Sequence, residues 1–299
     1  MKVVLIGSVC SSEHALDVML KKDIDISMVF SLDEEYSKNV SGYVPIHKIA
    51  QENNVPYKKF KNINDKENVD LLKKLDADYI FVIGLSQLVG KEVISCAKKQ
   101  VIGYHPAPLP KFRGRAAIVW QILLGVQKSA VTLFCIDDGI DSGKIICQEP
   151  FEIDENDYPE DIFEKCVDVD YRLFSKGIDL LLDPDFEPVP QDEKEATYLL
   201  KRSPRDGKID WSQPGSSIAR LVRATSKPYP GAFASYENKS DVIFWRAEFI
   251  PENKYIGFNG QIISVNEEYL EILCQGGILR VSDYENIDGV KMISGHRFM

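Results

Sequence analysis

The stretch Val101-Ile-Gly-Tyr-His-Pro-Ala-Pro-Leu-Pro-Lys-Phe-Arg-Gly114 joins a short apolar run to a proline-rich loop. The apolar run, which ends at Tyr104, is typical of a buried strand in a parallel sheet. His105 follows where this strand should end, and ligands bind at the carboxyl ends of strands in open α/β sheets. Three prolines at alternate positions stiffen the loop, and the first, Pro106, keeps His105 out of the helical region. His105 is therefore a candidate base, although a histidine that only caps the sheet would give the same pattern.

A second strand-and-loop pattern follows along the chain. Residues 130–136 are apolar enough to form another buried strand, and they lead into Asp137-Asp-Gly-Ile-Asp-Ser-Gly143, a turn-rich loop with three carboxylates. A carboxylate beside a histidine orients the ring and stabilises its charged form. Asp141 is the best candidate for this role. Asp137 and Asp138 are the alternatives, and either of them could equally be a solvated turn residue.

Together the two loops resemble a known family signature. The pattern His-Pro-x-x-Leu-Pro-x-x-Arg-Gly, followed by Asp-x-Gly-Ile-Asp-Ser-Gly, is similar to that of formyltransferases that use N10-formyltetrahydrofolate. The resemblance implies that His105 and Asp141 are the catalytic residues. The family also has an asparagine two residues before the histidine, where this chain has Gly103.

The departure at Gly103 leaves three explanations open. In the family the asparagine amide helps to hold the oxyanion, and the loss of one such donor typically costs a few kcal/mol. The replacement could be a protonated His105, a backbone N–H or a side chain such as Gln87. Alternatively, the glycine makes room for a different acceptor, or the domain only binds ligands.

The resemblance also implies contacts with both substrates. In the family, the loop after the strand at 79–84 holds the folate mainly through main-chain groups. We therefore assign to the folate pocket Leu85, Ser86, Gln87 and Leu88, with Asp137, Asp138, Gly139 and Ile140 of the second motif. We assign to the acceptor site Gly103, Pro106, Arg113 and Gly114. Arg113 suits an anionic group of the acceptor, but a structural arginine bonded to loop carbonyls is equally compatible with the sequence. We expect no metal site.

The remaining sequence divides into two domains. Alternating strand and helix patterns over residues 1–183 predict a Rossmann-like, doubly wound α/β catalytic domain. Residues 184–203 are rich in proline and charge and are interpreted as a linker. Short, turn-separated β-runs in residues 204–299 suit a small antiparallel β-domain, OB-like in character. The order Asp210-Trp211, a helix, Arg223-Ala224 and then Pro228-Tyr-Pro-Gly-Ala-Phe233 resembles the carboxy-terminal domain of methionyl-tRNA formyltransferase and, still more, that of the UDP-4-amino-4-deoxy-L-arabinose formyltransferase domain.

Composition narrows the class of protein. A chain of 299 residues is comfortable for two domains. The six cysteines show no C-x-x-C spacing, which predicts reduced and mostly buried thiols, without disulfides or zinc. We find neither a signal peptide nor an apolar run that could span a bilayer, and we expect a cytoplasmic protein. The formal net charge of −10 disfavours a nucleic acid as substrate but not a small anionic ligand.

The acceptor follows from the families that the sequence resembles. Methionyl-tRNA formyltransferases carry a basic insertion after the second strand, whereas residues 32–43 here are short and begin with acidic side chains. Glycinamide ribonucleotide formyltransferase lacks a second domain. We therefore expect an amino-sugar N-formyltransferase that acts on a UDP- or dTDP-linked sugar in glycan biosynthesis, with no nucleic-acid or membrane partner. Methionyl-tRNA formyl transfer and a non-catalytic folate-binding role are the alternatives, and a homodimer is left open.

Overall fold

The computed structural model describes residues 1–38, 40–85, 87–286 and 288–299, which form two compact units. The first unit consists of Met1–Ala117, Lys128–Glu152 and Glu164–Leu199. The second unit consists of Ile118–Gln127, Ile153–Phe163 and Leu200–Met299. Both sequence motifs, which end at Gly114 and Gly143, therefore lie in the first unit.

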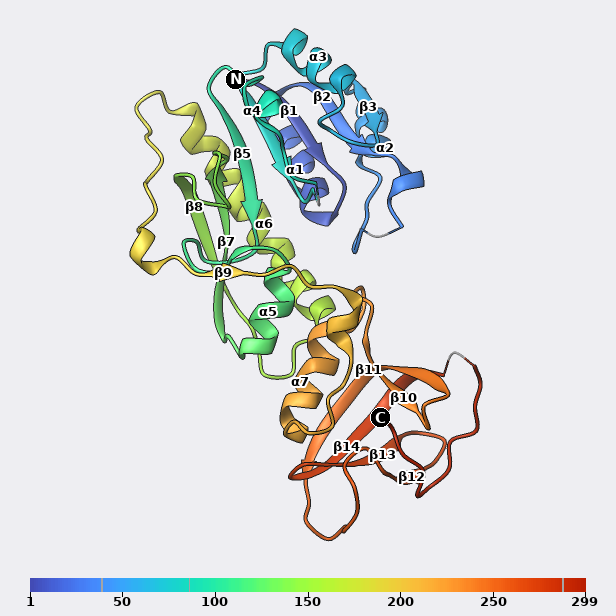
Figure 1. The fold of residues 1–299 in the computed structure, drawn as a ribbon. Coiled ribbons are helices and arrows are strands. Elements are labelled where there is room, and N and C mark those ends of the chain that lie inside the picture. The colour runs from blue at the N-terminus through green and yellow to red at the C-terminus, as the bar shows by residue number, and fades with distance from the viewer. Residues whose placement is uncertain (39, 86, 287) are drawn as a thin grey trace. The chain divides into compact units, whose positions relative to one another are not determined.

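A seven-stranded mixed sheet forms the centre of the first unit (Figure 1). Its strands, in spatial order, are β3 (Tyr57–Phe60), β2 (Asp25–Leu32), β1 (Lys2–Gly7), β4 (Tyr79–Ile83), β5 (Gln100–His105), β7 (Lys128–Cys135) and β8 (Ile145–Glu152). The strands from β3 to β5 pair in parallel, which confirms the predicted doubly wound fold. β7 and β8 extend the sheet in antiparallel fashion. The loop between Cys135 and Ile145 is too short for the crossover that parallel strands need.

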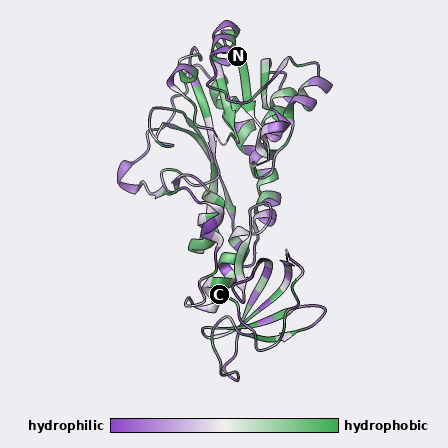
Figure 2. Ribbon diagram, turned by 45° about the vertical axis from the view of Figure 1, so that its right-hand side comes forward, coloured by the Kyte–Doolittle hydropathy of each residue, from purple (hydrophilic) through white to green (hydrophobic). Residues whose placement is uncertain are grey.

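Helices cover both faces of this sheet, since its strands are apolar on both sides. Figure 2 shows the strands mainly in green and the helices with purple segments. The helical elements are α1 (Cys10–Lys21), η1 (Glu34–Tyr36), α2 (Ile46–Glu52), α3 (Lys66–Leu75), α4 (Lys91–Ile94) and α6 (Pro159–Leu182). α1 and α6 share one face, where His14 contacts Asp170. α3 and α4 pack on the other, where Leu72 and Val93 join the buried cluster around Val4 and Val101.

The segment after α6 pairs with the loop that follows β5. β6 (Arg113–Gly114) and β9 (Tyr198–Leu199) form a short parallel pair, and η2 (Glu193–Glu195) precedes β9. We expected residues 184–203 to be a linker, but the first unit extends to Leu199. The reason lies in the main chain, where the Arg113 N–H donates to the Thr197 carbonyl at 2.9 Å.

The second unit is built on a five-stranded antiparallel sheet, which confirms the predicted small β-domain (Figure 1). Its strands, in spatial order, are β10 (Ala232–Tyr236), β11 (Ser240–Pro251), β14 (Gly277–Asn286), β13 (Leu270–Cys274) and β12 (Ile262–Val265). The helical elements are α5, which spans Ala117–Leu124 and begins in the first unit, η3 (Pro204–Gly207) and α7 (Gly215–Thr225). Phe244, Phe298 and Ile218 are part of its buried core. The first strand, β10, begins directly after Pro230-Gly231.

Cysteines and helices bear on two of the sequence predictions. All six cysteines are free, and five of them are buried, while Cys10 is half-buried. Burial raises the pKa of the Cys135 thiol to about 11 and that of Cys147 to about 12, so neither is reactive near neutral pH.

In the part of the chain that the structure describes, no helix has the length and apolar character to cross a membrane. The same part contains no group of three or more His, Cys, Asp or Glu side chains arranged to hold a metal ion.

Candidate active site

His105 lies at the carboxyl end of β5, and its side chain is only 7% exposed. Its Nε2 atom lies 2.7 Å from the main-chain oxygen of Phe112. Since a carbonyl oxygen can only accept a hydrogen bond, we assign a proton to Nε2. Nδ1 is then the ring nitrogen that can take up a further proton. The Phe112 carbonyl thus fixes both the orientation and the tautomer of the ring, which no side-chain pattern in the sequence indicates.

Asp141 faces the other ring nitrogen of His105. Its Oδ2 atom lies 3.7 Å from Nδ1, which is within ion-pair range but longer than a hydrogen bond. The Gly114 N–H donates to the same carboxylate oxygen at 2.7 Å. The structure therefore brings the two predicted catalytic residues together. The carbonyl of Phe112, rather than the carboxylate of Asp141, makes the hydrogen bond that orients the ring.

Left-handed backbone conformations surround this pair. Phe112, Ala116 and Asp141 have φ angles of 63°, 57° and 48°. Each such residue costs on the order of 1–3 kcal/mol, and strained residues of this kind persist at functional sites where their surroundings hold them. Gly114, with φ of 109°, requires glycine because a Cβ there would lie 2.5 Å from the Leu199 carbonyl oxygen. Gly114, which we assigned to the acceptor site, thus supports Asp141 and packs against β9.

Side chains from β7 and β8 anchor the proline-rich loop that starts at Pro106. The Thr132 hydroxyl donates to the Ala107 carbonyl at 2.7 Å, and the Gln148 amide donates to the Leu109 carbonyl at 2.8 Å. Thr132 lies directly opposite His105 in the pairing of β5 with β7. Neither anchor was predicted, because a threonine and a glutamine in apolar strands carry no distinctive spacing.

The ring of Phe134 fills the space that a side chain at position 103 would occupy. A Cβ on Gly103 would lie 2.8 Å from two ring carbons of Phe134 and 3.0 Å from Cγ1 of Ile136. Phe134 is 4% exposed and lies opposite Gly103 in the β5–β7 register. Position 103 therefore has no room for an asparagine unless the ring moves.

Arg113 is fully buried and bonded to the segment that follows α6. Its guanidinium donates to the side chains of Gln191, Glu193 and Tyr198 over distances from 2.7 to 3.1 Å. The hydrogen bonds to Glu193 are the main reason why the pKa of Arg113 is raised. Because these bonds engage all three nitrogens of the guanidinium, the structure favours a structural arginine over one that meets an anionic acceptor.

The loops after β4 and β7, which we assigned to the folate, lie next to each other. An ion pair of 3.0 Å joins Lys91, at the start of α4 directly after the first loop, to Asp138 of the second loop. Two apolar side chains on these loops are open to solvent, Leu88 at 85% and Ile140 at 61% exposure. Apolar side chains beside loop main-chain groups fit a planar, polar-edged ring such as that of a folate.

Two other residues assigned to the folate, Gln87 and Asp137, already have hydrogen-bond partners within the protein. The Gln87 amide donates to the Lys61 carbonyl at 2.6 Å and accepts from the Ile63 N–H at 3.0 Å. Asp137 accepts from the Gly139 N–H and the Ser142 hydroxyl, which closes a turn. Leu85 is half-buried in the loop after β4. Ser86 lies outside the described residues.

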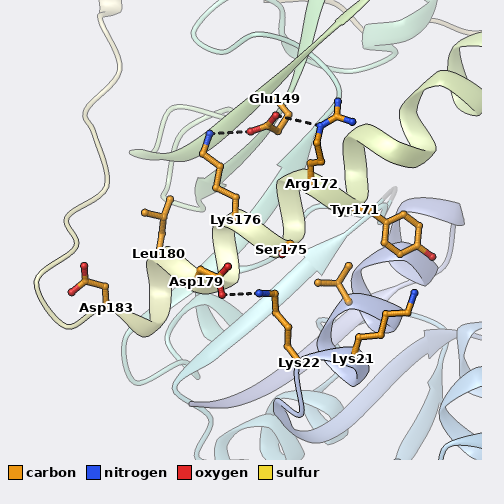
Figure 3. Close-up of a pocket in the computed structure, with 11 residues that line it drawn as sticks. Lys21, Lys22, Glu149, Tyr171, Arg172, Ser175, Lys176, Asp179, Leu180 and Asp183 are labelled. Carbon is orange, nitrogen blue, oxygen red and sulfur yellow. Dashed lines mark hydrogen bonds and ion pairs between the residues drawn. The ribbon is translucent and has the colours of Figure 1, made fainter.

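A groove of about 870 Å³ lies where α1 meets α6, and Figure 3 shows the side chains that line it. Its cations are paired, since Lys22 contacts Asp179 at 2.7 Å and Lys176 contacts Glu149 at 2.9 Å. Arg172 approaches the same Glu149 at 3.7 Å. The described residues of this groove include none that we assigned to the site, and its neutralised charges indicate no particular ligand.

Comparisons with known proteins support the predicted family. The family model described as "Formyl transferase" matches residues 1–178, and "Formyl transferase, C-terminal domain" matches residues 201–299. The bifunctional polymyxin resistance protein ArnA of Wigglesworthia glossinidia brevipalpis is 28% identical over 280 residues, which are 92% of this chain and 42% of that protein. The methionyl-tRNA formyltransferase of Rickettsia prowazekii (strain Madrid E) is 32% identical over 237 residues, 79% of this chain and 76% of that protein.

A solved structure shares the fold over nearly the whole chain. It is the N-formyltransferase from Helicobacter canadensis in complex with folinic acid and dTDP-3-aminofucose, with a TM-score of 0.72 and 22% identity. The match covers 95% of this chain and 100% of that one. Because one family model covers more than half of the residues and the Rickettsia protein exceeds 30% identity over most of both sequences, this chain belongs to the formyl transferase family.

Proposed function

We propose that this protein transfers the formyl group of N10-formyltetrahydrofolate to the amine of a nucleotide-linked amino sugar. The observation that carries the transfer chemistry is the pairing of His105 with Asp141 across 3.7 Å at the end of β5. Acyl transfer to an amine needs a base for the amine proton and a donor for the oxyanion. The folate supplies the activated formyl group, and residues on the loops after β4 and β7, such as Leu88 and Ile140, would hold it.

The two atoms that face each other, Nδ1 of His105 and Oδ2 of Asp141, define where a proton moves. In the assigned tautomer, Nδ1 of His105 and Oδ2 of Asp141 are both acceptors, so a proton donor between them satisfies both. An amine N–H of the acceptor is such a donor. As the amine attacks, His105 takes its proton at Nδ1, and Asp141 stabilises the imidazolium that results. The same proton can then pass from Nδ1 to the leaving nitrogen.

The oxyanion donor comes from a group other than residue 103. Phe134 closes that position, and the Gln87 amide is bonded to the Lys61 carbonyl. Of the candidates that the sequence suggests, the protonated His105 and a backbone N–H are left. We favour a backbone N–H, because both N–H groups of a protonated His105 are already engaged. Nε2–H donates to the Phe112 carbonyl, and the proton on Nδ1 lies beside Asp141 and passes to the leaving nitrogen.

The acidic segment after β2 supports a small acceptor rather than RNA. Asp33, Glu34 and Glu35 follow this strand, and Glu34 pairs with Lys59 at 2.6 Å. The hydrogen bond from Lys59 is the main cause that lowers the pKa of Glu34 to about 2, so this carboxylate is charged at neutral pH. Lys59 also lies 3.9 Å from Asp33 and offsets part of this negative charge, but Asp33, Glu34 and Glu35 themselves offer no cation to the phosphates of RNA. A nucleotide-linked sugar needs few such contacts. Methionyl-tRNA formyl transfer is the second candidate, because the Rickettsia relative is 32% identical.

The test is incubation of the purified protein with N10-formyltetrahydrofolate and a panel of UDP- and dTDP-linked amino sugars. Mass spectrometry should detect at least one sugar that has gained a formyl group. Methionyl-tRNA serves as the competing acceptor in a parallel reaction. Formylation of methionyl-tRNA alone would replace the proposed function by the second candidate, and no formylation of any acceptor would favour a binding role.

We predict that His105→Ala and Asp141→Asn each lower turnover about 10²–10⁴-fold, because the first removes the general base and the second removes the carboxylate that stabilises its charged form. Circular dichroism should show an unchanged fold, since neither side chain belongs to the buried hydrophobic core. Asp137→Asn is the matched control on the same loop and should lower turnover much less, because that carboxylate is bonded to Gly139 and Ser142. Near-normal turnover of either main variant would remove its residue from the mechanism.

A further inference from the structure

We infer that Gln191 is a positioning residue, which holds the loop that presents Asp141 to His105. The inference rests on the proposed function, since it assigns a task to the His105–Asp141 pair. It concerns a segment outside both sequence motifs, in the stretch that composition alone marks as a linker.

The side-chain amide of Gln191 is hydrogen-bonded at both ends. Its Nε2 donates to the main-chain oxygens of Asp141 at 2.8 Å and Gly143 at 2.7 Å. Its Oε1 accepts from Nε of Arg113 at 3.1 Å and from Nη2 at 2.8 Å. A reversed amide would set its oxygen against two carbonyls and its N–H groups against a guanidinium. The surroundings therefore permit one orientation.

Asp141 needs such support because its backbone is strained. Its φ of 48° lies in the left-handed region, and the conformation persists only where neighbours hold it. The Gly114 N–H fixes the carboxylate at 2.7 Å, and Gln191 fixes the carbonyls of the same residue and of Gly143. The main chain and the side chain of Asp141 are thus held by two different segments of the first unit.

Gln191 itself rests on a rigid base. Arg113 is fully buried, and Glu193 binds its guanidinium through two hydrogen bonds of 2.9 and 2.7 Å. Tyr198 adds a third bond at 2.9 Å and lies in β9, which pairs with β6. Because Glu193 and Tyr198 hold the planar Arg113 guanidinium in place, it fixes the position of the Gln191 amide. The arrangement explains why residues 191–199 belong to the first unit.

The expected consequence is a defect in turnover rather than in binding. A displacement of about 1 Å at a reacting group can cost about 10²-fold in rate. We expect Gln191→Met, which keeps the length but loses the hydrogen bonds, to lower kcat about 10-fold or more. KM for both substrates should change less than about 3-fold, since Gln191 contacts neither.

Gln191→Glu removes the N–H groups that donate to Asp141 and Gly143 while keeping an oxygen that accepts from Arg113. A glutamate keeps an oxygen for the guanidinium but sets a second oxygen against the carbonyls of Asp141 and Gly143. It should therefore be as impaired as Gln191→Met. Glu187→Gln is the matched control, because Glu187 is an exposed residue of the same segment with no part in this arrangement, and its turnover should equal that of the wild type.

A readout without substrate keeps this test apart from the proposed function. The chain has four histidines, so the ring resonances of labelled histidine can be assigned with His105→Ala. Gln191→Met should shift the resonance of His105 and leave those of His14, His47 and His296 in place. In the Asp141→Asn background, Gln191→Met should add no further shift.

The outcomes lead to distinct conclusions. An unshifted His105 resonance in Gln191→Met, or full activity of Gln191→Glu, would overturn the positioning role. Shifts of all four histidines would show a general change of structure and would overturn it as well. The expected shift in a protein that formylates no acceptor would support the positioning role and contradict only the proposed function.

Discussion

At the scale of single residues, Gly103 and Phe134 behave as one packing unit. The Phe134 ring lies so close to Gly103 that a Cβ at this position would be only 2.8 Å from two of the ring carbons. Gly103→Asn should therefore destabilise the protein by about 1–3 kcal/mol through overpacking, and turnover should stay flat or fall. Guanidinium unfolding and kcat measurements test this. A stable variant with a tenfold higher kcat would instead show that the site is degenerate.

The double variant Gly103→Asn/Phe134→Ala identifies the cause. Phe134→Ala alone should cost about 3–5 kcal/mol because it leaves a cavity. If the ring is what excludes the asparagine, the double variant should be more stable than the sum of the two single effects by about 0.5–3 kcal/mol. Additive effects would mean that some other contact makes position 103 intolerant.

Residues that take part in the chemistry can be predicted from the sequence more readily than the groups that position them. His105 and Asp141 stand in motifs with distinctive spacing, and the structure brings them within 3.7 Å. The Phe112 carbonyl has no side-chain signature, and Gln191 reaches Asp141 across 50 positions of sequence. Such partners depend on tertiary contacts, which local patterns do not encode. The same reason explains why the sequence left both a ligand contact and a structural role open for Arg113.

At the scale of elements, β5 carries a polar group on each of its faces. His105 belongs to the active site on one side, and Tyr104 points to α6 on the other, where its hydroxyl donates to Asp170 at 2.8 Å. His14 of α1 contacts the second oxygen of Asp170 at 3.0 Å. This buried network joins α1 and α6 to the strand that carries His105.

The buried carboxyl group of Asp170 should make the free energy of unfolding depend on pH. Its side chain is 2% exposed, and burial is the main cause that raises its pKa above the ordinary 3.8, against the lowering effect of His14 and Tyr104. From about pH 4 up to the folded-state pKa, the folded protein therefore binds more protons than the unfolded chain, and the free energy of unfolding falls as pH rises. Asparagine does not titrate. The stability of the wild type relative to Asp170→Asn should thus be greatest near pH 4 and decline as pH rises.

Guanidinium unfolding of both proteins at a series of pH values from about 4 to 8 measures this difference. Asp17→Asn, on the surface of α1, is the control for loss of a carboxylate. A difference that grows in favour of the wild type as pH rises would show that Asp170 folds as a charged group stabilised by its partners.

Elements with strong apolar patterns could be predicted from the sequence, whereas the two-residue strands, which form only through tertiary pairing, could not. The strands from β1 to β8, apart from β6, and the long helix α6 follow directly from runs and periodicity. β6 and β9 have two residues each, and they exist because residues 198–199 lie beside residues 113–114. A proline-rich segment gives no local sign of that pairing, and residues 184–199 therefore looked like a linker.

At the scale of the whole molecule, charge and family membership point to different acceptors. The family includes methionyl-tRNA formyltransferases, one of them 32% identical to this chain. The net charge of −10 and the acidic segment at Asp33–Glu35 oppose a polyanionic partner. Sequence identity reflects the shared fold and formyl-transfer site, whereas the acceptor is selected at the surface. The surface charges therefore weigh more in this choice.

We predict that the protein binds initiator tRNA no more tightly than non-specific association allows, with a Kd above about 10⁻⁵ M at physiological salt. Each lysine or arginine that neutralises a phosphate steepens the salt dependence of binding, and an acidic segment after β2 supplies none. Replacing Asp33 and Glu35 by lysine should strengthen RNA binding without affecting formylation of the sugar acceptor. Filter binding or fluorescence anisotropy at several salt concentrations measures both effects. Tight, steeply salt-dependent binding of the wild type, together with formylation of methionyl-tRNA, would establish the tRNA enzyme instead.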